Sequence, residues 1–308
     1  MASHILSEFR NPAAVSIGKF DGVHLGHRQI IKSLTAYKSG GLKAVVLGFE
    51  RSPAAFFTGQ PEGIISTHRQ RERLLKMLGV DEYIIYPVTE ESMGIDPEDF
   101  VRSVLVEKLH AKAVVAGEDC SFGKGGSGDM RLLMKLGDEL GLDITEVKKL
   151  RSAKYDCEIS SSKIREFIQA SDMEAAAELL GRPYSFEGTV IRGRQIGRTL
   201  GMPTANIYPE DGRLLPPFGV YVSKVRLSGR DHRAITNIGM NPTVGGKKVS
   251  VESYIFDFDR DIYEEEISVS LLRFLRPEKK FANLEELKEQ IGTDISVGMG
   301  LFSSHGIV

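Results

Sequence analysis

One short segment constrains the fold of this 308-residue chain more than any other. It follows an apolar run, Ala13 to Ile17, that predicts a buried strand. The chain then turns at Gly18 and Gly22 and enters a helical pattern with Ile30, Ile31 and Leu34 on one face. A strand, a glycine turn and a helix in this order indicate an α/β sheet in which a helix N-terminus faces a ligand.

Two histidines stand where this helix begins. His24 and His27 are three residues apart, so their side chains point the same way beside backbone N–H groups that lack helical partners. The arrangement predicts an anion site with two imidazoles directed at it. The alternative is an ordinary surface pair at a helix start. The same segment contributes four further candidates for nucleotide binding: Gly18, Phe20, Asp21 and Gly22.

The first half of the chain alternates strand and helix patterns. Expected strands are Lys43 to Phe49, Tyr83 to Val88, Ala113 to Ala116 and Ile144 to Val147; expected helices begin at Thr67, Asp96 and Met130. This alternation predicts a doubly wound, mostly parallel sheet with helices on both faces. Ligands of such sheets bind beyond the carboxyl ends of the strands.

Two more segments of this half are candidate ligand contacts. Residues 117–129 form a glycine-rich loop after a buried strand, and this loop holds Asp119; a flexible surface loop is the alternative. Residues 160–162 are consecutive serines that open a helix, followed by Lys163 and Arg165. Ser161 and Arg165 suit a triphosphate, which needs several donors and a forked guanidinium, whereas a simple N-cap is the other interpretation.

The periodicity changes near Pro183. A short helix pattern from Asp172 ends at Gly181, and beyond it apolar residues alternate. The expected strands are Glu187 to Arg192, Val220 to Leu227, Ala234 to Ile238, Val249 to Phe258 and Ile267 to Leu272. We therefore predict two domains, residues 1–182 and 183–308. The second is a small antiparallel β-barrel with a C-terminal helix capped by Asn283.

The barrel region contains two candidate sites. Gly193, Arg194, Gly197 and Arg198 form a plausible phosphate-covering flap, although the spacing is not that of a Walker motif. Thr204 and Asn206 are two apart, so their oxygens share a side of an extended segment and could bind Mg²⁺. A hydrogen-bonded turn after Pro203 is the alternative.

Glu252 interrupts the β-prone run from Val251 to Phe258. A carboxylate in a central strand needs a partner or a chemical role, which makes Glu252 a candidate general base. Exposure at a sheet edge is the alternative.

Composition disfavours several functional classes. Forty basic residues stand against 42 acidic ones, and the net charge of −2 argues against a general nucleic-acid binder. No apolar run approaches the roughly 18 residues of a membrane span, and the start lacks a signal-peptide pattern. Cys120 and Cys157 are too isolated for a disulfide framework or a zinc site. We expect a cytoplasmic protein with reduced thiols and neither nucleic-acid nor membrane partners.

Together these motifs resemble one family over nearly the whole chain, the bacterial bifunctional riboflavin kinase/FAD synthetases. The resemblance rests on ordered motifs in both halves: G-x-F-D-G-x-H-x-G-H at 18–27, G-E-D-x-x-F-G at 117–123, I-S-S-S-x-I-R at 159–165, G-R-x-L-G-M-P-T-A-N at 197–206, N-I-G-x-N-P-T at 237–243, V-E-S-Y-I-F-D-F at 251–258 and L-R-P-E-x-x-F at 275–281.

The resemblance implies an N-terminal FMN adenylyltransferase and a C-terminal riboflavin kinase with riboflavin, FMN and ATP as substrates. Glu252 would be the base on the riboflavin 5′-hydroxyl, and Thr204 and Asn206 would hold magnesium. His24 and His27 would neutralise charge at the adenylyl-transfer centre, while Ser161 and Arg165 grip the triphosphate.

The chain departs from the family pattern at one place. Where the family usually carries F-x-P-H-P, this sequence reads Phe49-Glu50-Arg51-Ser52-Pro53, and Cys120 replaces a usual phenylalanine. Arg51 could substitute as a phosphate ligand. Besides the two-step enzyme, two hypotheses stay open: a riboflavin kinase with a weak or silent first domain, and a flavin-binding regulatory protein.

Overall fold

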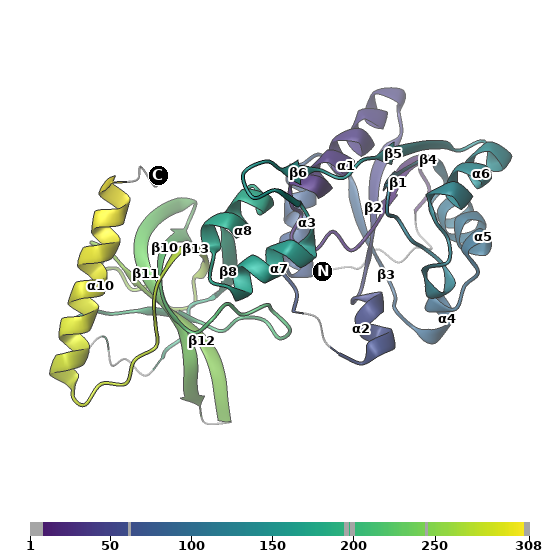
Figure 1. Cartoon of the computed structure of the whole chain (residues 1–308). Coiled ribbons are helices and arrows are strands. Elements are labelled where there is room, and N and C mark those ends of the chain that lie inside the picture. The colour runs from purple at the N-terminus through teal and green to yellow at the C-terminus, as the bar shows by residue number, and fades with distance from the viewer. Residues whose placement is uncertain (1–8, 61–62, 194–196, 198–200, 244–245, 305–308) are drawn as a thin grey trace. The chain divides into compact units, whose positions relative to one another are not determined.

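In a computed structural model of the protein, the structure describes residues 9–60, 63–193, 197, 201–243 and 246–304. Its contacts separate two compact units, Met1–Ser161 and Ser162–Val308 (Figure 1). In this division the segment 162–182 groups with the second unit. The domain boundary expected after residue 182 stays a prediction.

The first unit is built on a parallel sheet in the order β3-β2-β1-β4-β5. Its strands are β1 (Ala13–Ile17), β2 (Lys43–Phe49), β3 (Glu82–Tyr86), β4 (Ala111–Gly117) and β5 (Asp143–Val147). The strand order reverses between β1 and β4, and at such a switch point the loops after the strands diverge and leave a crevice for a ligand. The predicted parallel α/β sheet is confirmed.

Helices pack on both faces of this sheet, as the alternating pattern predicted. α1 (Leu25–Ala36) and α3 (His68–Met77) bury Ile31, Leu34 and Leu75 against one face. α5 (Pro97–Asp99), η3 (Phe100–Lys108) and α6 (Met130–Leu140) cover the other face. Short elements fill the connections: η2 (Tyr37–Gly40), α2 (Pro53–Thr58), α4 (Glu90–Met93), η4 (Lys124–Gly126), β6 (Arg151–Ser152) and β7 (Cys157–Glu158).

Local signals place the helix ends. Thr67 caps α3 through a capping box, in which its hydroxyl accepts from the Gln70 N–H and the Gln70 side chain accepts from the Thr67 N–H.

The helix expected from Asp96 differs from the prediction. After one turn it becomes the π-helix η3, and the Leu109 N–H donates to the carbonyl of Val104, five residues back.

The second unit is an antiparallel sheet in the order β8-β13-β10-β11-β12-β9, which agrees with the predicted antiparallel barrel class. The strands are β8 (Tyr184–Thr189), β9 (Ala205–Ile207), β10 (Gly219–Leu227), β11 (Arg230–Thr243), β12 (Gly246–Ile255) and β13 (Glu266–Pro277). Ile191, just after β8, forms a bridge to Asn206 of β9, and this bridge joins the two ends of the sheet.

One expected strand is shifted. β8 spans Tyr184–Thr189 rather than 187–192, because Tyr184 and Phe186 are the inward-facing side chains and are almost fully buried. The hairpin expected at 228–231 turns at Ser228 and Gly229, whose φ values of 48° and 80° suit a type I′ turn.

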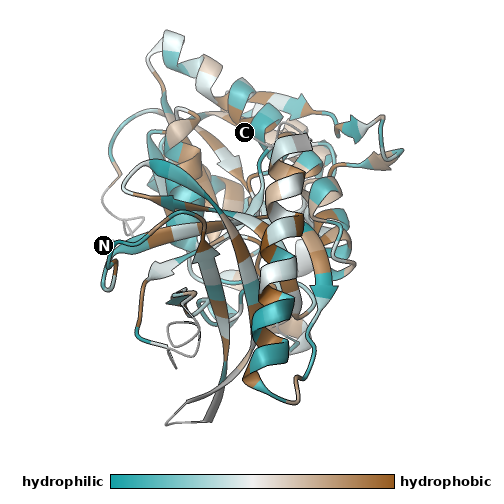
Figure 2. Cartoon of the chain, turned by 90° about the vertical axis from the view of Figure 1, so that its left-hand side faces the viewer, coloured by the Kyte–Doolittle hydropathy of each residue, from teal (hydrophilic) through white to brown (hydrophobic). Residues whose placement is uncertain are grey.

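Three helices belong to the second unit: α7 (Ser161–Gln169), which starts at its boundary, α8 (Met173–Leu180) and α10 (Leu284–Ser304). α10 begins as predicted, with the Asn283 side chain accepting from the Glu286 N–H. Its first turns are largely hydrophilic in Figure 2, whereas Phe302 near its end packs into a core with Val220, Val222 and Ile235.

We predict that a fragment of residues 162–308 folds and is more stable than one of residues 184–308. α8 packs on β8 and β13 and buries Met173, Leu179 and Leu180, so the shorter fragment exposes that strand surface. Burying a Leu or Met side chain contributes about 1.5–3 kcal/mol. Thermal unfolding of both fragments by circular dichroism measures the difference, and equal midpoints would place the boundary at residue 182.

Candidate active sites

The segment between β1 and α1 is a tight turn. The Val23 N–H donates to the Phe20 carbonyl at 3.1 Å, and Gly22 between them has φ = 84°, as a type II turn requires. Phe20 and Val23 also have positive φ values, 47° and 43°, although both are almost fully buried. Such conformations cost about 1–3 kcal/mol each and persist only where surrounding contacts impose them.

The carboxylate of Asp21 supplies those contacts. It is 3% exposed and accepts from the backbone N–H groups of Ile65 and Ser66 at 2.9–3.1 Å, from the Ser66 hydroxyl, and from Arg71 at 3.4 Å. The Ser66 hydroxyl oxygen in turn accepts from the Gly22 N–H at 2.8 Å. The carboxylate is thus held by protein groups, and nucleotide binding by Asp21 stays a prediction.

This turn delivers His24 to the start of α1. His24 is the N-cap residue, and its Nδ1 accepts from the His27 N–H at 3.3 Å. Because Nδ1 is the acceptor, the neutral ring carries its proton on Nε2, which can donate to an anion. The rings of His24 and His27 stack with centroids 3.6 Å apart, and the Phe20 ring lies 5.0 Å from that of His27. The two predicted imidazoles are therefore together.

Ser161 meets the same turn. Its hydroxyl donates to the carbonyl of Asp21 at 2.8 Å, so in this structure it braces the turn. Gly26 lets the chain pass closely, since a Cβ there would lie 3.2 Å from the carbonyl oxygen of Ile159. A Cβ on Gly18 would press on the Phe20 ring at 3.1 Å. Arg165 lies on α7 in the second unit, and its contact with a triphosphate stays a prediction.

Asp119 follows β4, the neighbour of β1 in the sheet. Its carboxylate is exposed and lies 3.3 Å from the ammonium of Lys149, which also pairs with Glu158 at 3.2 Å. Hydrogen bonds to Glu158 and Asp119 raise the pKa of Lys149.

Burial, together with nearby carboxylates, raises the pKa of the Cys120 thiol to about 11, which keeps it protonated and unreactive near neutral pH.

The residues that depart from the family pattern have structural partners. Arg51 donates from Nη2 to the carbonyl of Val88 at 2.9 Å, and its guanidinium lies 4.7 Å from the centroid of the Phe56 ring. Ser52 is the N-cap of α2. The Arg51 guanidinium therefore contacts protein groups in this structure. That Arg51 binds phosphate stays a hypothesis.

We expect Arg51→Ala to leave FAD formation from FMN and ATP within about twofold of the unmodified protein, because its guanidinium is already held. Ser52→His is the companion variant, and it should accelerate the reaction if an imidazole at this place is useful. Initial rates by chromatography of FAD decide. A drop of about tenfold or more in Arg51→Ala would show that the guanidinium turns to the phosphates during catalysis.

In the second unit, Glu252 lies in a cavity of about 440 Å³ between the sheet and α10. The cavity is lined by residues of four strands, the helix and the neighbouring loops: Val220, Ile235, Asn237, Glu252, Tyr254, Arg276, Leu287, Ile291, Asp294, Gly197, Met202, Thr204, Glu278, Lys279 and Phe281. Apolar and polar side chains both line it, and a concave site with convergent polar groups suits a small molecule.

Glu252 is the centre of a polar row across three strands. On β12 it pairs with Asn237 of β11 on one side and with Asn206 of β9 on the other. Directly opposed residues of an antiparallel pair carry their side chains on the same face of the sheet. The Glu252 carboxylate also accepts from the Ser250 hydroxyl at 3.2 Å. Glu252 thus lies among polar side chains, as a general base would. Because β12 is paired on both sides, Glu252 is not at an exposed sheet edge.

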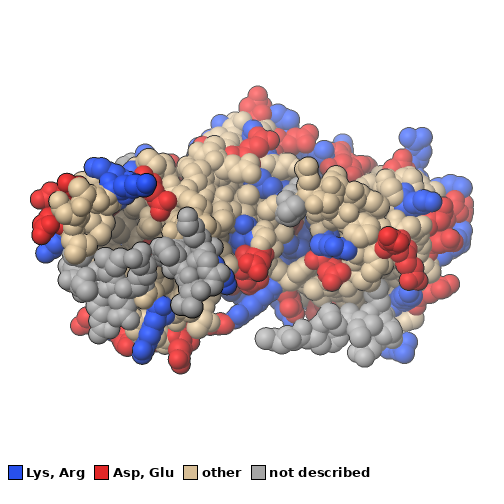
Figure 3. Space-filling model, turned by 90° about the horizontal axis from the view of Figure 1, so that it is seen from below, with Lys and Arg blue, Asp and Glu red and all other residues tan. Residues whose placement is uncertain are grey.

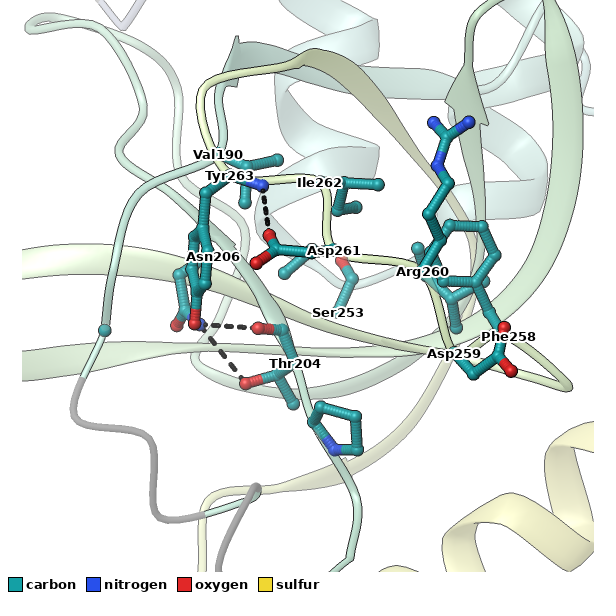
Figure 4. A pocket seen from close by; sticks show the side chains of 14 residues that line it. Val190, Thr204, Asn206, Ser253, Phe258, Asp259, Arg260, Asp261, Ile262 and Tyr263 are labelled. Atoms are coloured by element: carbon teal, nitrogen blue, oxygen red, sulfur yellow. Dashed lines mark hydrogen bonds between the residues drawn. The ribbon is translucent and has the colours of Figure 1, made fainter.

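A second cavity, of about 200 Å³, lies next to β12 (Figure 4). Ser253, the residue after Glu252, lines it together with Asn206, Asp261 and Tyr263. Thr204 borders both cavities. Two chambers that meet at one threonine suit two substrates that must react with each other.

Thr204 and Asn206 are linked. The Asn206 amide Nδ2 donates to the Thr204 carbonyl at 3.0 Å and to its hydroxyl at 3.2 Å. The amide lies against Gly193, where a Cβ would come within 2.8 Å of it. Gly197 is also required, since a Cβ would meet the Met202 carbonyl oxygen. Arg194 and Arg198 of the predicted flap lie outside the described residues.

Sequence reasoning missed an ion pair on the cavity wall, between Arg276 and Asp294. Arg276 of β13 binds Asp294 of α10 through Nε–Oδ1 at 2.9 Å and Nη2–Oδ2 at 2.7 Å, and Gln290 donates to the same carboxylate. This bidentate pair fixes the helix to the sheet. Asn237 was also missed as a site residue, although its motif N-I-G-x-N-P-T was recognised; strand pairing was needed to place it beside Glu252.

Comparisons with known proteins agree with this layout. The FAD synthetase family model matches residues 6–163, and the riboflavin kinase family model matches residues 180–302. The bifunctional riboflavin kinase/FMN adenylyltransferase of Listeria monocytogenes is 39% identical over 91% of this chain and 89% of its own length. Those of Escherichia coli and Bacillus subtilis are 34% and 33% identical over 94% and 98% of this chain.

The chain belongs to the bifunctional riboflavin kinase/FMN adenylyltransferase family. As a member of this family it carries an FAD synthetase domain followed by a riboflavin kinase domain, which confirms the family predicted from the motifs. A solved structure described as a macrolide-efflux protein from Streptococcus pneumoniae has a TM-score of 0.83 at 30% identity and covers 96% of each chain.

Two further observations concern the helices and the surface charge. Among the residues that the structure describes, none of the helices is both long enough and apolar enough to cross a membrane. Basic and acidic side chains are interspersed on the face seen in Figure 3.

We predict that Thr204→Ala and Asn206→Ala raise the KM for MgATP in FMN formation by about tenfold or more, since a hydrogen bond to a charged group contributes about 1.5–3 kcal/mol. Thr204→Ser keeps the hydroxyl and is the matched control. FAD formation from FMN should stay unchanged in all three. Wild-type KM and turnover in both alanine variants would favour the interpretation of 204–206 as a structural turn.

Proposed function

We propose that the protein phosphorylates riboflavin with ATP to give FMN and then adenylylates FMN with a second ATP to give FAD and pyrophosphate. The observation that carries the proposal is the position of Glu252, between Asn206 and Asn237 and one strand position from the wall of the second cavity. A carboxylate in the larger cavity, which shares Thr204 with the smaller one, is suited to activating a hydroxyl in its own cavity toward a phosphate in the other.

In the kinase step, riboflavin would occupy the larger cavity, against Val220, Ile235 and α10, and the nucleotide the smaller one. Glu252 accepts the proton of the 5′-hydroxyl. The resulting oxygen forms a bond to the γ-phosphorus of ATP, and the bond from that phosphorus to the bridging oxygen breaks to release ADP. Thr204, which lines both cavities, would orient the reacting groups.

Magnesium fits the residues present. Thr204 and Asn206 offer a hydroxyl, a carbonyl and an amide oxygen, which are hard ligands, and neither supplies a carboxylate. Among the described residues, no cluster of three or more His, Cys, Asp or Glu could hold a metal ion by itself. These features support an ion held jointly by the nucleotide phosphates and by Thr204 and Asn206, where it would neutralise phosphate charge.

In the adenylylation step, a phosphate oxygen of FMN forms a bond to the α-phosphorus of ATP while the bond to the pyrophosphate leaving group breaks. His24 would donate from Nε2 to the phosphate oxygens where charge develops, and the His27 ring, which stacks on it, would lie beside them. The backbone N–H groups at the start of α1 add a favourable field.

The test is incubation of the full chain with riboflavin, ATP and magnesium, with FMN and FAD separated by chromatography over time. FMN that rises first and FAD that follows would support the two-step enzyme. FMN alone, also when FMN is supplied as the substrate, would support a kinase with a silent first domain. Binding of flavin with neither product would leave the regulatory hypothesis.

A further inference from the structure

Arg71 is a buried cation outside the catalytic groups named above. Its side chain is 6% exposed, and its Nη2 lies 3.4 Å from the carboxylate of Asp21 and 3.0 Å from the carbonyl of Ser66. Both partners belong to the framework that holds the turn in front of His24. An arginine in so dry an environment must be paired, and its planar fork can bind two acceptors at fixed angles.

A third contact sets the orientation of the guanidinium. Nη1 of Arg71 donates to the hydroxyl oxygen of Tyr83 at 3.3 Å. The Tyr83 ring reaches this point by crossing β2 over Gly48, where a Cβ would lie 2.6 Å from the hydroxyl oxygen. Glycine is therefore required at position 48 for Tyr83 to meet Arg71.

His68 fixes the direction of this hydrogen bond. Its Nε2 is 2.8 Å from the carbonyl oxygen of Glu50, which can only accept, so Nε2 carries the proton. Nδ1 of the neutral ring then accepts from the Tyr83 hydroxyl at 3.1 Å. With its proton committed to His68, the Tyr83 oxygen presents a lone pair to Arg71. Burial lowers the pKa of His68 and favours this neutral form.

We propose that Arg71, oriented by Tyr83 and His68, is a positioning residue for adenylyl transfer. The proposal rests on the proposed function of the first unit. Arg71 binds Asp21 and Ser66 at once, and these two residues hold the turn from Phe20 to Val23 in its strained conformation. The turn leads directly into His24, whose Nδ1 accepts from the His27 N–H, so that the neutral ring carries its proton on Nε2.

A purely structural role for Arg71 would make a different prediction. Such an arginine contributes to the free energy of unfolding, and its loss lowers thermal stability without changing His24 in the molecules that remain folded. A positioning role changes His24 itself. The hydrogen-bonding state of the His24 ring therefore separates the two, and it can be read whether or not the protein makes FAD.

The experiment uses the full chain labelled with ¹⁵N-histidine, with His24→Asn to assign the His24 signals. In the unmodified protein, we expect the pattern of a ring protonated at Nε2 and accepting at Nδ1. In Arg71→Met this preference should be lost. The kcat for FAD formation should fall about tenfold or more, with the KM for FMN and ATP within about twofold. Arg71→Lys should recover part of both.

Tyr83→Phe is the milder variant, since it removes one hydroxyl and leaves the charge pair of Arg71 with Asp21 in place. We expect a loss in kcat of about threefold and a partial change in the His24 signal. Tyr86→Phe is the matched control, because Tyr86 lies on the same strand but packs into the core on the other face of the sheet. Riboflavin phosphorylation in the same chains should be unchanged.

A wild-type His24 signal in Arg71→Met would overturn the proposal, as would a wild-type kcat. If Arg71→Met fails to fold, Tyr83→Phe decides by the same two measurements, and its identity with Tyr86→Phe would overturn the proposal. Failure of the proposed function shows separately, as an absence of FAD from the unmodified protein, while the His24 signal continues to test Arg71.

Discussion

Replacement of Glu252 by glutamine should lower the rate of FMN formation by about 10²–10⁴ while riboflavin binding stays nearly intact. Glutamine has the shape of glutamate and retains an oxygen that can accept from the Ser250 hydroxyl at the same place. What it loses is the ability to take the proton of the riboflavin 5′-hydroxyl. Initial rates of phosphorylation and riboflavin fluorescence titration measure the two quantities.

Glu285→Gln is the matched control for this prediction, because it removes a carboxylate from the first turn of α10, outside both cavities. It should leave both quantities unchanged. A rate for Glu252→Gln within about threefold of the unmodified protein would remove the carboxylate from the role of general base.

Replacement of His24 by asparagine should reduce FAD formation from FMN by about 10²–10³, the cost typical of one lost donor at a developing oxyanion. Asparagine is among the best N-cap residues, so the start of α1 is preserved. The loss of activity then measures the contribution of the imidazole alone. Phosphorylation of riboflavin by the same chains is an internal control and should not change.

A comparison with His24→Ala separates the two roles of His24. Alanine removes the imidazole and the cap together, and loss of a cap costs about 1 kcal/mol of stability. Both variants should therefore lose activity to the same degree, whereas only the alanine variant should melt at a lower temperature. Wild-type FAD formation in His24→Asn would show that the imidazole is dispensable.

Much of the fold could be predicted because local signals were strong. β1 and β2 have the predicted bounds and α6 begins at the predicted Met130, since apolar runs bounded by glycine or a capping residue leave few alternatives. α2 was missed although Ser52 followed by Pro53 is a good helix start; a helix this short contributes too little periodicity to be seen. The π-helix η3 shares its buried stripe with an α-helix, so its hydrogen bonds could not be read from the pattern.

The candidate sites were less predictable because they depend on contacts between distant residues. Asp21 stays a predicted nucleotide-binding residue, but its motif gave no sign that its carboxylate pairs with residues 44 to 50 positions away. Similarly, Asn237 and Glu252 became neighbours only through the pairing of β11 with β12. Residue type predicted the chemistry, whereas the direction of each side chain depended on tertiary packing.

The wall that α10 contributes to the larger cavity has a consequence for how activity arises during protein synthesis. The first unit ends at Ser161, but the cavity is not enclosed until Leu287, Ile291 and Asp294 have been added and Asp294 has met Arg276. At the usual pace of translation the interval is on the order of ten seconds. A nascent chain can thus complete its first unit well before the larger cavity of the second unit is enclosed.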